Sequence, residues 1–487
     1  MVYCKCRVWV HIAEGGILTL PAFERIFDPA RLLKSSKQSA DSLPPASETV
    51  GNLARVAWPS ILESFFVSLV SMVDTIMVGT LGHEAIASVG LTSQPRLIVL
   101  ALFMSLNIGV TAVVSRRRGE GNRASANHTL RQALLLASIL AIVISAVAVY
   151  FAEPLLLFAG AQPDALEGAV SYFRIIIGGI FFNIISLTIN AAHKGCGNTR
   201  IAMRTNIYAN LINILFNYLL IGGNLGFPKL GVAGAAIATT LGYFVAFLIS
   251  LSSVRKPERF LYLSFRESFL PDKQNFSSLM NVGSSAAVEQ VFIRIGFFIF
   301  AKIIASLGTL AFSTHQICTN ILNLSFAFGD GLGVAASSLV GQSLGRKRPD
   351  LAIVYGKTAQ RAGFMIGACL CVFFIAMRRI LILPFSQETG IINMGAQILL
   401  ILSVMCPAQI SQVIFSNCLR VAGDTRYVAV VSLICIGLGR TVVAYFFTIT
   451  LAWGLLGAWF SFLLDQACRL TLSGLRFSKG RWTKLRL

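Results

Sequence analysis

Charged side chains are scarce in this sequence, and their scarcity excludes a water-soluble globule of this length. Asp, Glu, Lys and Arg make up 13% of the 487 residues, about half the usual share in a soluble protein. So few charges could not cover the surface of such a globule. Because 55% of the residues are hydrophobic, the chain also lacks the composition of a disordered protein. We therefore expect an integral membrane protein.

Motifs for nucleotide, metal and nucleophile chemistry are also missing. Gly356-Lys357-Thr358 is like the end of a phosphate-binding loop, but Leu351 stands where that loop needs a glycine. The five histidines have no paired metal-ligand spacing, and the ten cysteines form no CxxC pair. No Gly-x-Ser-x-Gly nucleophile elbow occurs. These absences predict a protein that is not an enzyme and needs no cofactor.

Long apolar runs are the most frequent feature of the chain. Runs of about 20 residues between charged or turn-rich breaks predict an all-α membrane protein with twelve transmembrane helices. A β-barrel is excluded because the runs are continuously apolar rather than alternating. The predicted spans are residues 56–78, 88–114, 129–151, 169–190, 203–221, 231–253, 277–305, 312–340, 357–383, 391–418, 428–450 and 454–475.

The basic residues are distributed unevenly among the predicted loops. Lys and Arg number 32 in the two termini and the even-numbered loops, whereas the odd-numbered loops carry only Lys229. The positive-inside rule then places both termini in the cytoplasm of a cell that holds the protein in its inner or plasma membrane. The net charge of +20 is explained by attraction to anionic membrane lipids, so no nucleic acid is expected as a partner.

The chain matches itself at an offset of 226 residues, which indicates an internal duplication. Because each copy holds six spans, both copies enter the membrane from the same side, and two such bundles that face each other enclose a central cavity. The aligned positions are Leu81-Gly82 with Leu307-Gly308, Ala85 with Ala311, Gly119 with Gly345, Glu63 with Glu289, and Gly197-Asn198-Thr199-Arg200 with Gly423-Asp424-Thr425-Arg426.

This repeat predicts a chain of five parts. The segment before the first span mixes Ser, Pro and charge and lacks a signal-peptide pattern, so we expect it to be disordered. The parts are a cytoplasmic N-terminal tail over 1–50, an N-lobe over 51–254, a cytoplasmic linker over 255–275, a C-lobe over 276–478 and a cytoplasmic C-terminal tail over 479–487.

Several motifs at the ends of the spans are typical of one transporter family. They are Trp58-Pro59, Met72-Val-Asp74-Thr75-Ile76-Met77-Val-Gly79, Ser115-Arg-Arg-Arg118-Gly119-Glu-Gly121, Gly195-Cys-Gly197-Asn198-Thr199, Asn213-x-x-x-Asn217, Gly341-Gln342-Ser-Leu-Gly345 and Arg420-Val-Ala-Gly423-Asp424-Thr425. With the layout of two times six spans, the chain resembles the multidrug and toxic compound extrusion (MATE) family of bacterial type over about residues 51–478. The resemblance implies a V-shaped pair of lobes that exports organic, often cationic, compounds against inward flow of Na⁺ or H⁺.

Asp74 is the strongest candidate for ion coupling. A charged group inside a bilayer costs at least about 2.5–3.5 kcal/mol, so a buried ionisable residue is a functional candidate. Asp74 lies about one turn from the outer end of the first span, and Asn217 and Asn213 share one face of the fifth span at similar depth. This carboxylate with two amide oxygens could hold Na⁺, and the carboxylate alone could take a proton. The alternative is that Asp74 only forms hydrogen bonds within its lobe.

Glu289 in the seventh span matches the buried glutamate that the family resemblance implies for the second lobe. Some members place an aspartate of the tenth span beside it, and the position here is most nearly Gln409. The alternative is that Glu289 forms a structural pair with an arginine from another helix.

Five further residues complete the set of candidates. Glu63, Gln409, Asp465 and Asp330 are secondary candidates for ion coupling, and Pro59 is a candidate hinge because proline bends a helix. Glu63 and Asp74 are eleven residues apart and share a helix face, so they could form successive steps of a proton path. The alternative is that Glu63 is only satisfied by a partner on a neighbouring helix.

Two other functions stay open. A lipid-linked oligosaccharide flippase of a related two-lobe superfamily would need a cluster of cavity arginines, and Arg174, Arg294 and Arg440 in one cavity would favour it. A membrane-embedded enzyme would need a convergent nucleophile, base or metal set. Small-molecule drugs and membrane lipids are the expected partners, and we expect a monomer. The sequence leaves the substrate and the choice between Na⁺ and H⁺ open.

Overall fold

The computed structural model describes residues 25–33, 42–79, 83–158, 163–264, 267 and 273–485. Within these ranges every regular element is a helix, as predicted. One group of helices, which we call the N-lobe, consists of α4 (Ala46–Gly79), α5 (His83–Gly119), α6 (Arg123–Tyr150), α7 (Ala152–Phe158), α8 (Pro163–Gly178), α9 (Ile180–Gly195), α10 (Thr199–Gly222), η2 (Asn224–Gly226) and α11 (Gly231–Ser253).

The second group, which we call the C-lobe, follows the same order. It consists of α12 (Lys273–Ala305), α13 (Thr309–Gly345), α14 (Pro349–Met377), α15 (Thr389–Val421), α16 (Thr425–Ser432), η3 (Leu433–Arg440), α17 (Thr441–Tyr445), η4 (Phe446–Thr450) and α18 (Gly454–Lys479). Two short helices flank the lobes, α3 (Pro29–Leu32) before them and η5 (Arg481–Lys484) after them.

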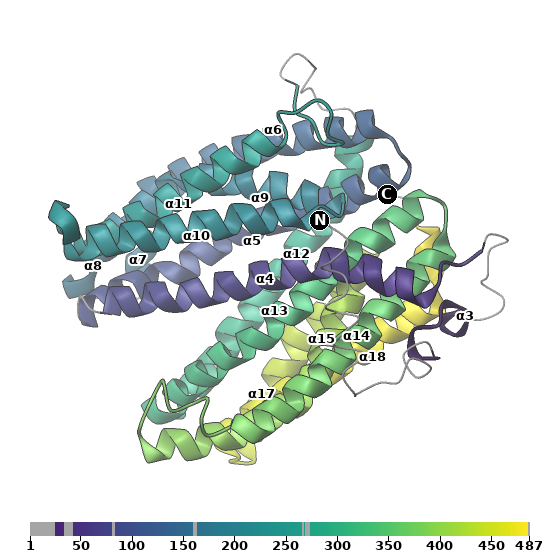
Figure 1. Ribbon diagram of the computed structural model, residues 1–487. Helices are drawn as coiled ribbons and strands as arrows, with labels where there is room; N and C mark the ends of the chain where they lie inside the picture. The colour runs from purple at the N-terminus through teal and green to yellow at the C-terminus, as the bar shows by residue number, and fades with distance from the viewer. Residues whose placement is uncertain are drawn as a thin grey trace.

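The helices account for the twelve predicted spans. Eight helices of the described chain are long and apolar enough to cross a membrane, with α16 to η4 counted as one, and the bent pair α8–α9 makes a ninth. The remaining three are the more polar helices α10, α12 and α18, which have 24, 33 and 26 residues and run along the same bundles (Figure 1).

Two predicted spans are not the uniform α-helices that the apolar pattern indicated. The fourth, 169–190, bends by 45° between α8 and α9. The bend falls at Gly179, where a Cβ atom would lie 2.3 Å from the Thr240 Cγ2 atom, so only glycine allows α11 to pack this closely. The eleventh, 428–450, contains two π-helical stretches, η3 and η4, a form that concentrates at functional sites.

Part of the predicted disordered tail is ordered instead. Phe27, Leu32 and Leu33 are buried against the C-lobe, and Lys357 Nζ on α14 donates to the Leu32 carbonyl at 2.7 Å. The reason is that this short stretch carries enough apolar side chains to cover part of α14. The first transmembrane helix also begins earlier than predicted, at Ala46. Residues 1–24 lie outside the described residues.

The two lobes form a V whose halves meet at one end. Figure 1 shows that they lie together near α3 and the C-terminus and diverge toward α7 and α8. The first helix of each lobe packs on the second helix of the other, so that α4 contacts α13 and α12 contacts α5. The two-lobe architecture expected from the sequence implies a central cavity on this side, and we call the region between the diverging lobes the central cleft.

The glycines of the repeat explain how closely the lobes meet. A Cβ on Gly119 of α5 would lie 2.0 Å from the Gln342 carbonyl oxygen, and one on Gly345 of α13 would lie 2.1 Å from the Arg116 carbonyl oxygen. Gly119 and Gly345 are repeat partners, and so are Arg116 and Gln342. The two contacts are therefore reciprocal, as expected where two copies of one unit cross near their symmetry axis.

Adding one methyl group at this crossing should separate the lobes at their closed end. For Gly119→Ala we expect about tenfold faster alkylation of Cys196, because overpacking against a backbone carbonyl costs about 1–3 kcal/mol. Cys196 lies between Gly195 and Gly197, which both approach Gln342 of α13. The rate is measured by mass spectrometry of the Cys196 peptide after pulses of N-ethylmaleimide.

The matched control for this experiment is Gly51→Ala on α4. No atom lies within 4 Å of a Cβ at that glycine, so its labelling rate should equal that of the wild type. Equal rates for Gly119→Ala and Gly51→Ala would contradict the closed crossing.

Candidate functional site

The structure brings the three main N-lobe candidates together. Asn217 Nδ2 of α10 donates to Asp74 Oδ1 of α4 at 2.7 Å. The hydrogen-bond network orients the Asn213 amide so that its oxygen accepts from the Thr239 N–H of α11 at 3.2 Å and its nitrogen donates to Asp74 Oδ1 at 2.9 Å. Both asparagines are buried, with exposed fractions of 5% and 1%. They reach one carboxylate because they are four residues apart on one helix face.

Three residues near Asp74 were not recognised from the sequence. Arg96 of α5 is hydrogen-bonded to Tyr172, and its charge acts on Asp74 and Tyr243. We call Asp74, Asn213, Asn217 and these three residues the N-lobe pocket. The available signal for Arg96 was its place inside an apolar run, where an arginine needs a partner. Nothing in the spacing marked the tyrosines.

The N-lobe pocket has the chemistry of a small-cation site. Its available oxygens are those of the Asp74 carboxylate and the Asn217 amide, since the Asn213 oxygen already accepts from Thr239 of α11. Asn217 Oδ1 is buried and has no hydrogen-bond partner within the described residues. A buried amide oxygen without a partner is costly, so this oxygen is available to a ligand. Arg96 balances the charge of an ionised Asp74, so binding of one cation leaves the pocket with a single positive charge.

The candidates Glu63 and Glu289 lie in two equivalent ion pairs. Lys194 Nζ donates to Glu63 Oε1 at 2.8 Å, and Arg420 Nη2 donates to Glu289 Oε1 at 2.6 Å. The same carboxylates accept from Asn206 Nδ2 at 2.6 Å and from Ser432 Oγ at 2.9 Å, respectively. The two ion pairs are related by the repeat. The counterparts 226 positions further on are Glu289 for Glu63, Arg420 for Lys194 and Ser432 for Asn206.

These ion pairs change the expectations for three candidates. Glu289 is fully buried against Arg420, which is the structural alternative that the sequence left open. Gln409 does not join it, since Gln409 Oε1 accepts from Ser325 Oγ at 2.7 Å in another part of the C-lobe. Glu63 and Asp74 do share a helix face, because both bind asparagines of α10.

Asp465 of α18 is enclosed within the C-lobe. It forms ion pairs with Arg469, at 3.0 Å, and with Arg440 of η3. The Arg440 guanidinium is buried and lies over the rings of Phe297 and Phe462, with distances of 4.8 and 4.1 Å to the ring centroids. This cluster of a carboxylate, two arginines and aromatic rings is typical of a structural ion pair.

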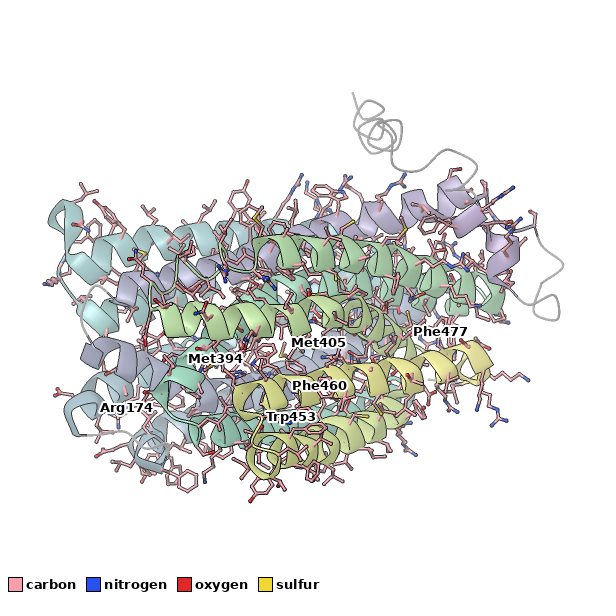
Figure 2. All side chains as sticks on the ribbon, turned by 90° about the horizontal axis from the view of Figure 1, so that it is seen from below. Arg174, Met394, Met405, Trp453, Phe460 and Phe477 are labelled. Atoms are coloured by element: carbon pink, nitrogen blue, oxygen red, sulfur yellow. The ribbon has the colours of Figure 1, made fainter. Side chains whose placement is uncertain are left out.

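The arginines that would bind a pyrophosphate do not converge. Arg174 is exposed on α8 of the N-lobe, at the end of the molecule away from Phe477 (Figure 2). Arg440 is buried inside the C-lobe, with an exposed fraction of 1%. The condition stated above for a flippase is therefore not met.

The two remaining candidates lie where the lobes meet. Pro59 is inside α4, close to Val56, whose carbonyl accepts from Thr199 Oγ1 at 2.8 Å. The proline itself leaves the carbonyl of Arg55, four residues earlier, without its helical donor. Asp330 of α13 is exposed, and the charges of Lys194 in the N-lobe and Arg420 in the C-lobe both act on it.

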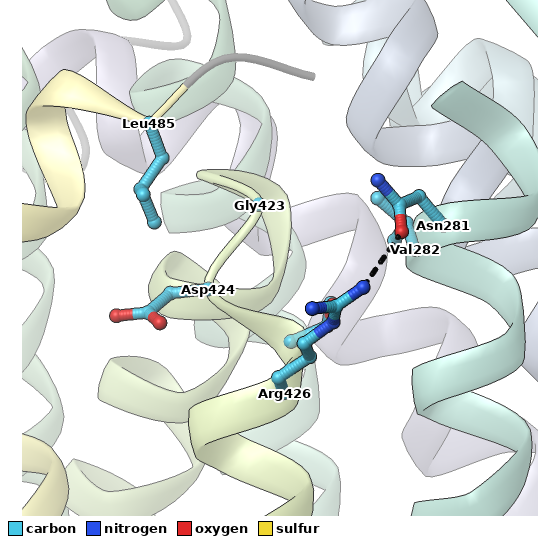
Figure 3. Close-up of a pocket in the computed structure, with 7 residues that line it drawn as sticks. Asn281, Val282, Gly423, Asp424, Arg426 and Leu485 are labelled. Carbon is cyan, nitrogen blue, oxygen red and sulfur yellow. Dashed lines mark hydrogen bonds between the residues drawn. The ribbon is translucent and has the colours of Figure 1, made fainter. Parts of the chain in front are cut away.

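A small pocket lies at the closed end of the V, apart from the N-lobe pocket. It has a volume of about 250 Å³ and lies between the start of α12, the turn from α15 to α16 and Leu485 (Figure 3). Arg426 Nη2 donates to Asn281 Oδ1 across it at 3.3 Å, and Asp424 is held by Arg476 Nε at 2.7 Å. We interpret this pocket as a gap left where the C-terminal segment packs onto the C-lobe.

Known proteins share both the sequence and the fold. The MatE family model matches residues 59–219 and 285–446, once in each lobe. Relatives are the "Uncharacterized transporter YisQ" of Bacillus subtilis, 28% identical over 90% of this chain and 96% of that protein, and the "Probable multidrug resistance protein NorM" of Thermotoga maritima, 27% identical over 89% and 93%.

Two solved structures show the same fold. The "Outward-facing conformation of a multidrug resistance MATE family transporter of the MOP superfamily" has a TM-score of 0.83 at 21% identity and covers 88% of this chain and 96% of its own. A MOP superfamily transporter from Pyrococcus furiosus, whose title reports a reverse polarity of its binding pocket, has a TM-score of 0.84 at 22% identity and covers 90% and 97%. With a family match over more than half of its length, this chain belongs to the MatE family of membrane transporters.

Proposed function

We propose that the protein exports organic compounds, often cationic, in exchange for inward flow of Na⁺ or H⁺. The observation that carries this proposal is the N-lobe pocket, where a membrane-depth carboxylate meets two buried asparagines. A charged group at that depth is costly, and the direct partners of Asp74 are neutral amides rather than a cation, which favours a role in binding an ion. Relatives that are named multidrug resistance proteins agree with this function.

The open side of the V is the side where the coupling ion would enter. The closed end carries most of the basic loops, with 32 Lys and Arg in the termini and even-numbered loops. Arg378 and Arg379 follow the end of α14, so the opposite side carries these two besides Lys229. This bias still favours a cytoplasmic closed end with both termini inside the cell, and a central cleft that opens outward in the cell membrane.

In the proposed cycle, one conformational change carries the ion into the cell, and its reversal carries the substrate out. An ion that enters from outside neutralises Asp74 and alters its hydrogen bonds to Asn213 and Asn217, which connect α4 to α10. Pro59 lets α4 bend in response. The reciprocal contacts of α5 and α13 then separate, and the central cleft opens to the cytoplasm. We propose that a monomer suffices, because both lobes belong to one chain.

Transport in proteoliposomes with one ion gradient at a time tests this function. We expect ethidium movement to require either a Na⁺ gradient at equal pH or a pH gradient without Na⁺, and the gradient that drives transport identifies the ion. Empty liposomes under the same gradients are the control. If neither gradient drives any of ethidium, norfloxacin or tetraphenylphosphonium, the proposed export is wrong.

A further inference from the structure

We propose that Asp330 of α13 binds the positive group of a cationic organic substrate at the floor of the central cleft. This inference rests on the proposed export function and names the residue that recognises the charge of the substrate. It assigns Asp330 a role different from that of Asp74, which binds the coupling ion.

The packing of α13 places Asp330 between the lobes. A Cβ on the next residue, Gly331, would lie 2.5 Å from Ile61 Cγ1 of α4, in the opposite lobe. A Cβ on the preceding residue, Gly329, would lie 3.6 Å from Val413 Cβ of α15, in the same lobe. With α4 and α15 on these two sides, the exposed Asp330 side chain is directed to a third side.

The charges around Asp330 identify this third side as the central cleft. Lys194 of α9 belongs to the N-lobe and Arg420 of α15 to the C-lobe, and both act electrostatically on Asp330. A side chain can be near both cations only where the lobes face each other. At membrane depth, an exposed carboxylate has to face water or a charged partner rather than lipid.

The local charge balance leaves room for one more cation. Lys194 and Arg420 are already paired with Glu63 and Glu289, whose carboxylates are nearly or fully buried. Among the residues that the structure describes, Asp330 has no hydrogen-bond or ion-pair partner, although the charges of Lys194 and Arg420 act on it. These three carboxylates and two cations carry one net negative charge, which a monovalent cation would neutralise.

The repeat places a carboxylate at this position in the C-lobe only, because the equivalent residue of the N-lobe is a methionine. Asp330 is 226 positions after Met104 of α5, and the Met104 side chain is 48% exposed. By the duplication, in which α4 contacts α13 as α12 contacts α5, the Met104 position in the N-lobe is equivalent to that of Asp330 in the C-lobe. A flexible, polarizable thioether opposite a carboxylate suits a lipophilic cation with an aromatic ring system.

Binding of two probes to the purified full-length chain tests the proposal. Ethidium carries a permanent positive charge, whereas norfloxacin has little net charge near neutral pH. For Asp330→Asn we expect about tenfold or greater loss of ethidium affinity and less than a twofold change for norfloxacin. Asp330→Glu should retain ethidium binding. Glu153→Gln, an exposed carboxylate of α7, is the matched control and should bind both probes as the wild type does.

Each other outcome overturns this proposal. If the wild type exports ethidium and Asp330→Asn binds it equally well, the substrate site is elsewhere while the export function stands. If Asp330→Asn loses both probes to the same extent, the residue supports the fold rather than recognising charge. If the wild type neither binds nor transports ethidium under any gradient, the proposed function fails together with this inference.

Discussion

Asp74→Asn is expected to abolish ion-coupled export and to leave the fold intact. The substitution keeps the shape of the side chain but removes the charge that a Na⁺ ion or a proton would neutralise. Asn217 and Asn213 would then face a third amide, which offers them one oxygen instead of two. The measurement is ethidium export by proteoliposomes under the gradient that drives the wild type, which should fall to the level of empty liposomes.

Two comparisons make the Asp74 result specific. The thermal unfolding midpoint of Asp74→Asn in detergent should stay close to that of the wild type. Asp74 forms no direct ion pair with Arg96, so the free energy of unfolding should fall by at most about 1 kcal/mol. Glu153→Gln, which removes an exposed carboxylate outside the N-lobe pocket, should transport normally. Full ion-dependent transport by Asp74→Asn would show that coupling occurs at another residue.

Asp465→Asn, unlike Asp74→Asn, should strongly lower the stability of the folded protein. Removing one partner of a buried ion pair leaves an uncompensated charge and costs about 3–5 kcal/mol. Arg440 would keep its charge inside the C-lobe, where it is 1% exposed and lies against Phe297 and Phe462. We expect a clearly lower unfolding midpoint and a lower yield of folded protein, measured by size-exclusion fluorescence after heating.

The control for Asp465 is a pair at the surface. Glu267 is 56% exposed and pairs with Arg131, so Glu267→Gln should change the stability by at most about 1 kcal/mol. Arg440→Met added to Asp465→Asn should recover part of the lost stability, because it removes the unpaired charge. A stable Asp465→Asn variant with impaired transport would instead assign Asp465 to ion coupling.

The sequence predicted the duplicated architecture because repeats and hydrophobic length are local patterns. The offset of 226 residues predicted equivalent helix ends, and the structure shows why two of its glycines recur. Gly197 and Gly423 have φ angles of +78° and +95°, which end α9 and α15 in the left-handed conformation that glycine adopts without strain. The bend at Gly179 was missed because it depends on Thr240, which is distant in the sequence.

The order of the residues was sufficient for the number of spans, the two copies and the shared helix face of Asn213 and Asn217, since each follows from periodicity along one chain. Only the tertiary structure decided which partner each buried charge received. Glu289 pairs with Arg420 and Asp74 with Asn217, although both acids looked alike as single charges in apolar runs. Arg96 likewise joined the N-lobe pocket only through the packing of α5. The physical reason is that the free energy of a buried charge depends on groups brought close by packing, and sequence spacing does not encode those distances between helices.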